Sequence, residues 1–337
     1  QGFQVHLVER EPSLGGMMRN VHNTLEQADV QKHLQQLADR TLSNPKIRVY
    51  LNSEAVKISG QAGNFTSVVN VAGNETSIEH GVVIVATGGY ERSTEQFLHG
   101  RNPRVKTQSK LESELAGGKL PAQLKSKKKP SVVMIQCVES RDEKNPYCSR
   151  VCCAEAIKNA LEIKRRLPES TVVILGRDMR TYGFREEFYQ KAVEQGVRFI
   201  RHSGEHMPEV VGTRGPLKVK VRDSSTGDDL TFSPDLLVLS TGVAPAAKNP
   251  ELSTMLRSAL TTDGFFQEAH PKLRPVDLAN EGEFLCGWAH SPRFMDETIA
   301  QAQAAAARAS TILSKKQLEI MGRIACINPV NCIACAT

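Results

Sequence analysis

The sequence predicts an α/β protein in which parallel sheets lie between layers of helices and carry small antiparallel insertions. Two apolar runs, residues 81–86 and 235–239, each end in a Thr-Gly pair, as buried parallel strands do where a nucleotide passes. Between them, an apolar strand over 131–137 leads into an amphipathic helix over about 149–166. Because such a strand–helix junction is where a dinucleotide-binding unit holds phosphate, these observations predict two such units in one chain.

Length and composition narrow the class of protein. The chain has 337 residues, enough for two domains with separate cores, and its 40% hydrophobic content is ordinary for a globular protein. The net charge is +6, but the basic stretch 125–129 has no aromatic residues, so we expect a solvated linker and no nucleic-acid partner. No apolar run is long enough to span a membrane. Clustered cysteines in a chain of this size favour a reducing, cytoplasmic compartment.

Residues 3–8 are expected to form the second strand of a dinucleotide-binding unit, and Glu9 follows it at once. In a dinucleotide-binding unit an acid in this position binds a ribose hydroxyl, and a Gly-x-Gly-x-x-Gly loop precedes it by about 20 residues. We therefore expect the first strand and its loop to lie before Gln1, so that the chain is truncated. The turn Gly15-Gly16-Met17 that follows allows the backbone to approach a bound dinucleotide closely.

Further elements follow along the chain. Residues 24–42 are expected to form an amphipathic helix, and residues 47–51, 55–58 and 65–71 strands of the small antiparallel layer. The polar, turn-rich stretch 117–130 is the expected crossing between domains. The expected domains are a first dinucleotide-binding domain over 1–120, a second nucleotide-binding-like domain over 131–235, a return to the first domain over 236–313, and the start of a ferredoxin-like segment over 314–337.

The second unit continues as a strand over 171–175, a helix over about 184–195 and a strand over 197–200. The last strand of the first domain is expected at 284–287. A helix over 291–309 is expected to point its N-terminus at the bound cofactor, where its amide donors favour negative charge.

Four cysteines replace the glycines at the junction that opens the second unit: Cys137, Cys148, Cys152 and Cys153. Four thiolates suit an iron–sulfur cluster or a zinc ion, and the spacing matches neither the usual zinc pattern nor the ferredoxin run. Ser149 is positioned to cap a helix whose positive end favours thiolates. A cluster is favoured over zinc, with purely structural cysteines as the remaining alternative.

The segment IQCVESRDEKNPYCSRVCCAEAIKNAL, residues 135–161, resembles the flavin-binding, iron–sulfur A-subunit of heterodisulfide reductase, and so do residues 177–201 with their Thr-Tyr-Gly-Phe turn. The resemblance implies a thioredoxin reductase-like, two-domain flavoprotein with FAD and [4Fe-4S] clusters. It implies that the four cysteines ligate one cluster and that Lys158 reaches the flavin near N5. The implied partners are other heterodisulfide reductase-type subunits, a hydrogenase or formate dehydrogenase-type donor, and ferredoxin, in a complex containing a homodimer of this chain.

The residues expected to hold FAD lie on the turns and strand ends described above. They are Glu9, Arg10, Gly15, Gly16, Met17, Thr87, Gly88, Gly89, Thr241, Gly242 and Gly287. Near the C-terminus, Cys326, Cys332 and Cys335 resemble the opening of a bacterial ferredoxin motif.

The resulting expectation is an electron-transfer protein that passes electrons between FAD and [4Fe-4S] clusters, with flavin-based electron bifurcation as its extension. One alternative is an NAD(P)H-dependent disulfide reductase, which needs a redox cysteine pair and a glycine loop in the second unit, and the sequence has cysteines in place of that loop. The other is a non-catalytic scaffold stabilised by zinc.

Overall fold

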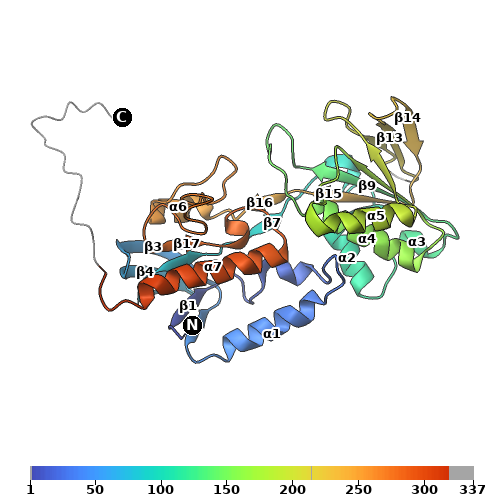
Figure 1. The fold of residues 1–337 in the computed structure, drawn as a ribbon. Coiled ribbons are helices and arrows are strands. Elements are labelled where there is room, and N and C mark those ends of the chain that lie inside the picture. Colours follow the sequence, from blue (N-terminus) through green and yellow to red (C-terminus); the bar gives the residue numbers. More distant parts are fainter. Residues whose placement is uncertain (1, 214, 319–337) are drawn as a thin grey trace, which may run out of the picture.

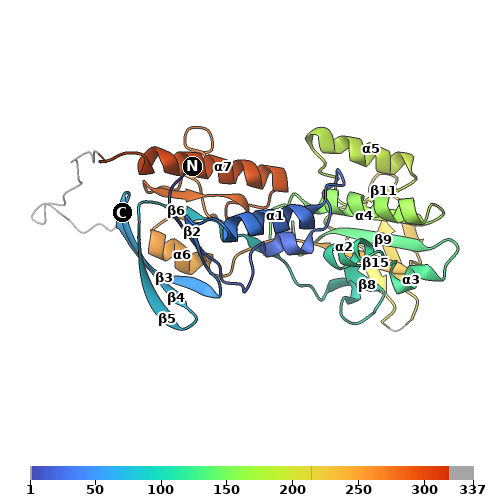
Figure 2. The ribbon, with the colours of Figure 1, turned by 90° about the horizontal axis from the view of Figure 1, so that it is seen from below.

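The computed structural model describes residues 2–213 and 215–318, and Figure 1 shows that they form two lobes. Figure 2 shows the first lobe with α1 and α7 and the second with the helices α2, α3, α4 and α5. The lobes are joined by β7 (Gly89–Glu91) and β16 (Val243–Pro245), which pair antiparallel as a narrow ribbon. The chain thus passes between the lobes twice through one two-stranded connection.

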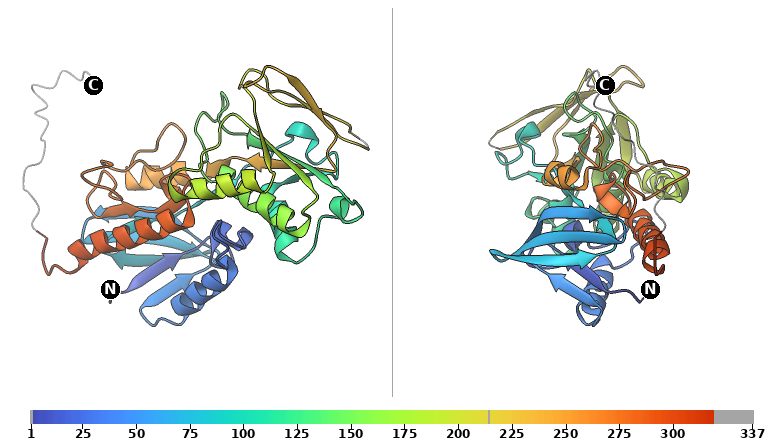
Figure 3. Two further views of the ribbon diagram at one scale, coloured as in Figure 1. Left: turned by 45° about the vertical axis from the view of Figure 1, so that its right-hand side comes forward. Right: turned by 90° about the vertical axis from the view of Figure 1, so that its left-hand side faces the viewer.

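The first lobe contains two separate parallel pairs. β1 (Val5–Val8) pairs with β2 (Ile47–Tyr50), and β6 (Val83–Val85) pairs with β17 (Glu283–Leu285). The stretch 47–51, expected in the antiparallel layer, therefore belongs to a parallel pair, because α1 (Val30–Leu42) connects it to β1 as a crossover. The antiparallel layer consists of β3 (Ser53–Gln61), β4 (Asn64–Val71) and β5 (Asn74–His80), and Figure 3 shows it beside α7.

Two helices of the first lobe begin later than the sequence pattern indicates. α1 starts at Val30, since the Asp29 carboxylate accepts a hydrogen bond from the Lys32 amide at 2.9 Å. α7 (Met295–Leu313) starts after Phe294, whose amide is capped by Glu297 at 2.9 Å. The remaining short elements are the 3-10 turns η1 (Gly16–Asn20) and η4 (Gly287–Ala289) and the helix α6 (Asn249–Leu256).

The second lobe is built on a five-stranded parallel sheet in the order β11-β10-β9-β15-β8. Its strands are β8 (Val105–Thr107), β9 (Ser131–Val138), β10 (Thr171–Gly176), β11 (Arg198–Arg201) and β15 (Leu236–Thr241). Its helices are α2 (Gln108–Ala116), α3 (Ala122–Lys125), α4 (Cys152–Arg166) and α5 (Glu186–Glu194). The 3-10 turns are η2 (Gln96–Leu98) and η3 (Gly183–Arg185), and a three-stranded antiparallel sheet comprises β12 (Glu209–Val211), β13 (Lys218–Arg222) and β14 (Asp229–Phe232).

The crossing between lobes lies earlier than the sequence pattern indicates. β8 and α2 precede the stretch 117–130, yet β8 is the edge strand of the second sheet and α2 packs against α4. The chain leaves the first lobe at β7, because β7 is the strand that pairs with the returning β16.

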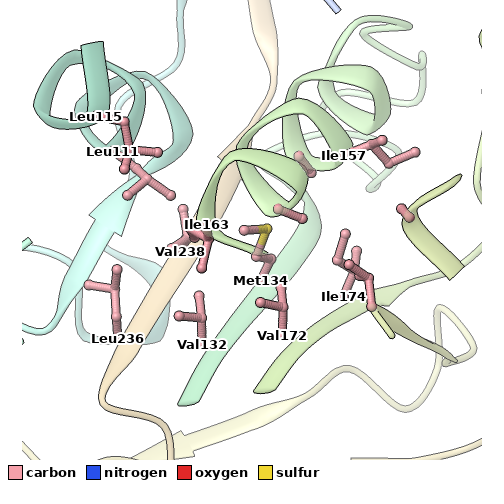
Figure 4. Close-up of a cluster of buried hydrophobic side chains, with 14 of the residues drawn as sticks. Leu111, Leu115, Val132, Met134, Ile157, Ile163, Val172, Ile174, Leu236 and Val238 are labelled. Carbon is pink, nitrogen blue, oxygen red and sulfur yellow. The ribbon is translucent and has the colours of Figure 1, made fainter. Parts of the chain in front are cut away.

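Alternating side chains of β9 fill both faces of the second sheet. Val132 and Met134 pack with Ile157 of α4 (Figure 4), while Val133 and Ile135 pack on the opposite face. These side chains are fully buried, and each such burial contributes about 1.5–3 kcal/mol. The dense core fixes the carboxyl end of β9 against the N-terminus of α4, which is where the cysteines lie.

Candidate functional site

The end of β9 and the loop from β9 to α4 form one segment with an unusual backbone. Cys137, Glu139, Arg141 and Arg150 all have positive φ, between 53° and 61°. The left-handed conformation costs a residue with a side chain about 1–2 kcal/mol, so four instances in one loop mean that packing or function requires this shape.

The four predicted cysteines lie on the end of β9, on this loop and in the first turn of α4. Cys153 is buried, and Cys137, Cys148 and Cys152 are partly exposed. Burial raises the pKa of the Cys153 thiol to about 12, and neighbouring thiols, those of Cys137 and Cys148, contribute to the rise. Burial also raises the pKa of Cys137 and of Cys152, and here too the other cysteines contribute. The four sulfur atoms therefore lie within electrostatic range of one another, and binding of a metal or cluster must release their protons.

The segment 137–153, which carries the four cysteines, is called the cysteine loop below. Backbone contacts hold it in place. The Arg150 amide lies 3.3 Å from the Cys148 sulfur, and the Cys152 thiol donates to the Thr241 carbonyl at 3.6 Å. Ser149 was expected to cap α4 and does not, because its hydroxyl accepts a hydrogen bond from the Val243 amide at 2.8 Å. The cysteine loop is thereby attached to the strand pair through which the chain crosses between lobes.

Lys158, the predicted catalytic residue, is buried and forms an ion pair with Glu112 of α2 at 2.7 Å. Its ammonium also donates to the Asn23 carbonyl at 2.9 Å. The Glu112 carboxylate in turn accepts from the amides of His22 at 2.7 Å and Asn23 at 3.3 Å. Glu112 is a site residue that sequence reasoning missed, since no local pattern relates a glutamate in α2 to a lysine in α4. The pair joins the second lobe to the loop that follows the Gly-Gly-Met turn.

The predicted cofactor glycines fall into two groups. A Cβ atom added to Gly16 or Gly88 would meet nothing within 4 Å, and both residues have positive φ. At the other four positions an added Cβ would contact protein: Leu34 Cδ2 at 2.9 Å for Gly15, the Ala244 carbonyl at 2.6 Å for Gly89, the Glu139 carbonyl at 2.7 Å for Gly242 and Thr298 Cγ2 at 3.0 Å for Gly287. Packing therefore explains the second group, and of these six glycines Gly16 and Gly88 face open space.

The remaining predicted cofactor residues are dispersed. Glu9 is half-buried at the end of β1 and accepts from the Glu11 amide at 2.9 Å, while exposed Arg10 pairs with Glu11. Met17 lies in η1. Thr87 donates to Asn249 at 2.9 Å.

Thr241 and Gly242 lie with the cysteine loop. Thr241 accepts the Cys152 thiol and donates its hydroxyl to Glu91 at 2.8 Å, and Gly242 packs on Glu139. The structure thus places these two residues at the junction of the lobes, next to the cysteines.

Two kinds of feature are absent from the part of the chain that the structure describes. Within 2–213 and 215–318, no three Cys, His, Asp or Glu side chains converge closely enough to bind a single metal ion. No helix in these ranges has the length and apolar character needed to cross a bilayer. Cys326, Cys332 and Cys335 lie outside the described residues.

Comparison with known proteins places the sequence. No family model matches it. A Methanopyrus kandleri protein, the second iron-sulfur A-subunit of CoB--CoM heterodisulfide reductase, is 30% identical over 100% of this chain and 65% of its own length. The A-subunit of the Methanothermobacter thermautotrophicus H(2):CoB-CoM heterodisulfide,ferredoxin reductase is 36% identical over 77% of this chain and 41% of its own length. The iron-sulfur A-subunit of the Methanocaldococcus jannaschii CoB--CoM heterodisulfide reductase is 38% identical over 73% of this chain and 39% of its own. The chain spans less than two thirds of these three relatives.

Solved structures confirm the fold class. Thioredoxin reductase from T. acidophilum superposes with a TM-score of 0.57 at 16% identity, covering 93% of this chain and 90% of that one. Thioredoxin reductase from Lactococcus lactis gives a TM-score of 0.58 at 15% identity, covering 93% and 100%. By sequence the chain is a homologue of heterodisulfide reductase A-subunits over most of its length. Its fold is the thioredoxin reductase-like architecture of two dinucleotide-binding units.

Proposed function

We propose that the chain is the flavin- and cluster-binding part of an electron-transfer subunit in a heterodisulfide reductase-type complex. The observation that supports this most directly is the set of four thiols gathered between β9 and α4, beside the ribbon that joins the two lobes. A group bound there lies between the second sheet and the first lobe. When bound, FAD exchanges electrons in pairs or singly, and a [4Fe-4S] cluster exchanges them singly.

The thiols of Cys137, Cys148, Cys152 and Cys153 are the proposed cluster ligands. Their chemistry fits the group, because iron–sulfur clusters are held by four thiolates and the cysteine loop already offers an N–H donor to one sulfur. The name of the M. kandleri relative describes an iron-sulfur subunit, which supports a cluster as the kind of group that is bound.

FAD is proposed to lie in the first lobe. The backbone at Gly16 and Gly88 is proposed to contact it closely, because both glycines face open space. Glu9 is proposed to bind a ribose hydroxyl through the carboxylate oxygen that does not accept the Glu11 amide. Lys158 is proposed to place positive charge near the flavin. An ammonium has three donors, and Glu112 and Asn23 account for two of them.

The proposed physiological reaction couples this electron transfer to heterodisulfide and ferredoxin reduction by bifurcation, in the cytoplasm. The proposed assembly is a homodimer within a larger complex that includes a hydrogenase or formate dehydrogenase-type donor. The relative from Methanococcus maripaludis, the A-subunit of an H(2)/formate:CoB-CoM heterodisulfide,ferredoxin reductase, supports these partners.

Anaerobic reconstitution of the full chain with iron and sulfide tests the proposed function. We expect the chain to bind iron and acid-labile sulfide with broad visible absorption, and each of Cys137→Ser, Cys148→Ser, Cys152→Ser and Cys153→Ser to lower the iron content. Cys286→Ala is the matched control, because Cys286 is a buried cysteine of the first lobe. Zinc binding without sulfide that depends on the same four cysteines would instead establish the scaffold alternative, and tight NADPH binding to the second lobe would establish the disulfide reductase.

A further inference from the structure

Arg150 lies between two of the four cysteines, yet its side chain leaves their loop. Its φ is 61°, and its amide points to the Cys148 sulfur at 3.3 Å. Arg150 therefore combines a direct backbone contact to a cysteine with a side chain directed elsewhere.

That side chain reaches the first lobe. Arg150 Nη2 lies 2.8 Å from Glu297 Oε1, and the two side chains are 32% and 27% exposed. The hydroxyl of Tyr182 accepts from the same guanidinium and lies 3.4 Å from the same carboxylate oxygen, and the guanidinium stacks 5.2 Å from the Tyr182 ring. Three residues from separate segments thus form one polar cluster.

Glu297 lies in the first turn of α7, and its other oxygen caps the Phe294 amide at 2.9 Å. In Figure 1, α7 runs along the first lobe with this end toward the second lobe. The Thr-Tyr-Gly-Phe turn adds a second contact, because Tyr182 packs edge-on against Phe294 with 5.8 Å between the ring centroids. The guanidinium of Arg185, the residue after this turn, lies 3.7 Å from the Phe294 ring centroid. The resemblance implies that this turn shapes the surroundings of the cluster or flavin, and in the structure it faces the start of α7.

We propose that Arg150 is a positioning residue that couples the cysteine loop to the N-terminus of α7, with Tyr182 and Glu297 completing the link. This rests on the proposed function, in which the cysteine loop holds a cluster and α7 directs its N-terminus at the flavin. The link then fixes the separation of the two centres. Movement of either element is transmitted to the other, because Glu297 serves both as the partner of Arg150 and as the cap of the helix.

Amide hydrogen exchange on the full-length chain, without added iron or flavin, tests the coupling. We expect Arg150→Ala to raise exchange at least roughly threefold both in residues 148–152 and in the first turn of α7, in keeping with the coupling energies of contacting charged pairs. Arg150→Lys, which retains the charge, is expected to restore most of the protection of α7. Glu297→Gln, which leaves the cysteine loop sequence unchanged, is expected to raise exchange in residues 148–152.

Asp296→Asn is the matched control. Arg185, which follows the Thr-Tyr-Gly-Phe turn, forms an ion pair with Asp296 of α7 at 2.8 Å. Asp296→Asn removes this neighbouring pair and leaves the pair of Arg150 with Glu297 in place. The proposal is overturned if Arg150→Ala changes only residues 148–152, or if Asp296→Asn has the same effect on that loop. Because no cofactor is loaded, this outcome is independent of whether the four cysteines bind a cluster.

Discussion

Lys158 and Glu112 form a buried ion pair at 2.7 Å, with only 9% and 6% of their side chains exposed. The two residues come from α4 and α2, and their shared partners are the backbone groups of residues 22 and 23 in the first lobe. A residue proposed for flavin chemistry is therefore also part of the contact between lobes.

The first prediction concerns this pair. Removing one partner leaves the other charge buried, so Lys158→Met or Glu112→Gln should each lower the free energy of unfolding by about 3 kcal/mol. The double variant should lose much less than the sum, because neither charge is then left alone. Denaturant unfolding of the parent protein, the two single variants and the double variant measures this double-mutant cycle. Lys248→Met, which breaks an exposed pair with Glu251, serves as control and should change stability by less than about 1 kcal/mol. Strict additivity in the double variant would contradict this account.

The second prediction separates two adjacent glycines. Gly88→Ala adds a methyl group to open space, where it should obstruct FAD and weaken its binding. The positive φ of residue 88 should also make this variant less stable by about 1–2 kcal/mol. Gly89→Ala places the methyl group 2.6 Å from the Ala244 carbonyl, so it should disrupt the β7–β16 pairing and lower the melting temperature further. Flavin fluorescence titration and thermal unfolding measure the two effects. Unchanged flavin affinity in Gly88→Ala would remove Gly88 from the proposed cofactor site.

The third prediction concerns pH. Burial alone would raise the pKa of Asp277, but hydrogen bonds from Arg308 at 3.0 and 2.8 Å and from Arg274 at 3.2 Å hold that pKa below its ordinary value. A carboxylate with a lowered pKa in the folded state stabilises the protein above its unfolded pKa, and this contribution is lost as the pH falls through the folded value.

We therefore expect Asp277→Asn to lower stability at pH 7 by about 2 kcal/mol, the contribution of charge-assisted hydrogen bonds. The difference in stability between Asp277→Asn and the parent protein should disappear as the pH falls below about 4. Thermal unfolding between pH 7 and pH 3 measures it, with the exposed Asp228→Asn as control. A gap that stays constant down to pH 3 would show that Asp277 acts by shape alone.

Local patterns in the sequence were sufficient for the fold class and for locating the four cysteines at one strand–helix junction. The apolar run of residues 131–137 and the helical spacing around Ile157 are properties of short segments, and burial of apolar surface imposes the same period in the folded protein. The four cysteines sit at a strand–helix junction, and chain connectivity alone brings such a junction together. The named relatives confirm what these patterns indicated about the class of protein.

Only the tertiary structure decided which residues from distant segments meet. Glu112 beside Lys158 and Glu297 beside Arg150 depend on how the helices pack, which no short-range pattern encodes. Tertiary contacts also decided that Gly89 and Gly242 serve packing whereas Gly16 and Gly88 face open space, since glycine permits both uses and its sequence context is the same. Tertiary contacts also explain why α4 begins at Cys152 and not near residue 149. The Ser149 hydroxyl accepts a hydrogen bond from the Val243 amide of β16 and does not cap the helix.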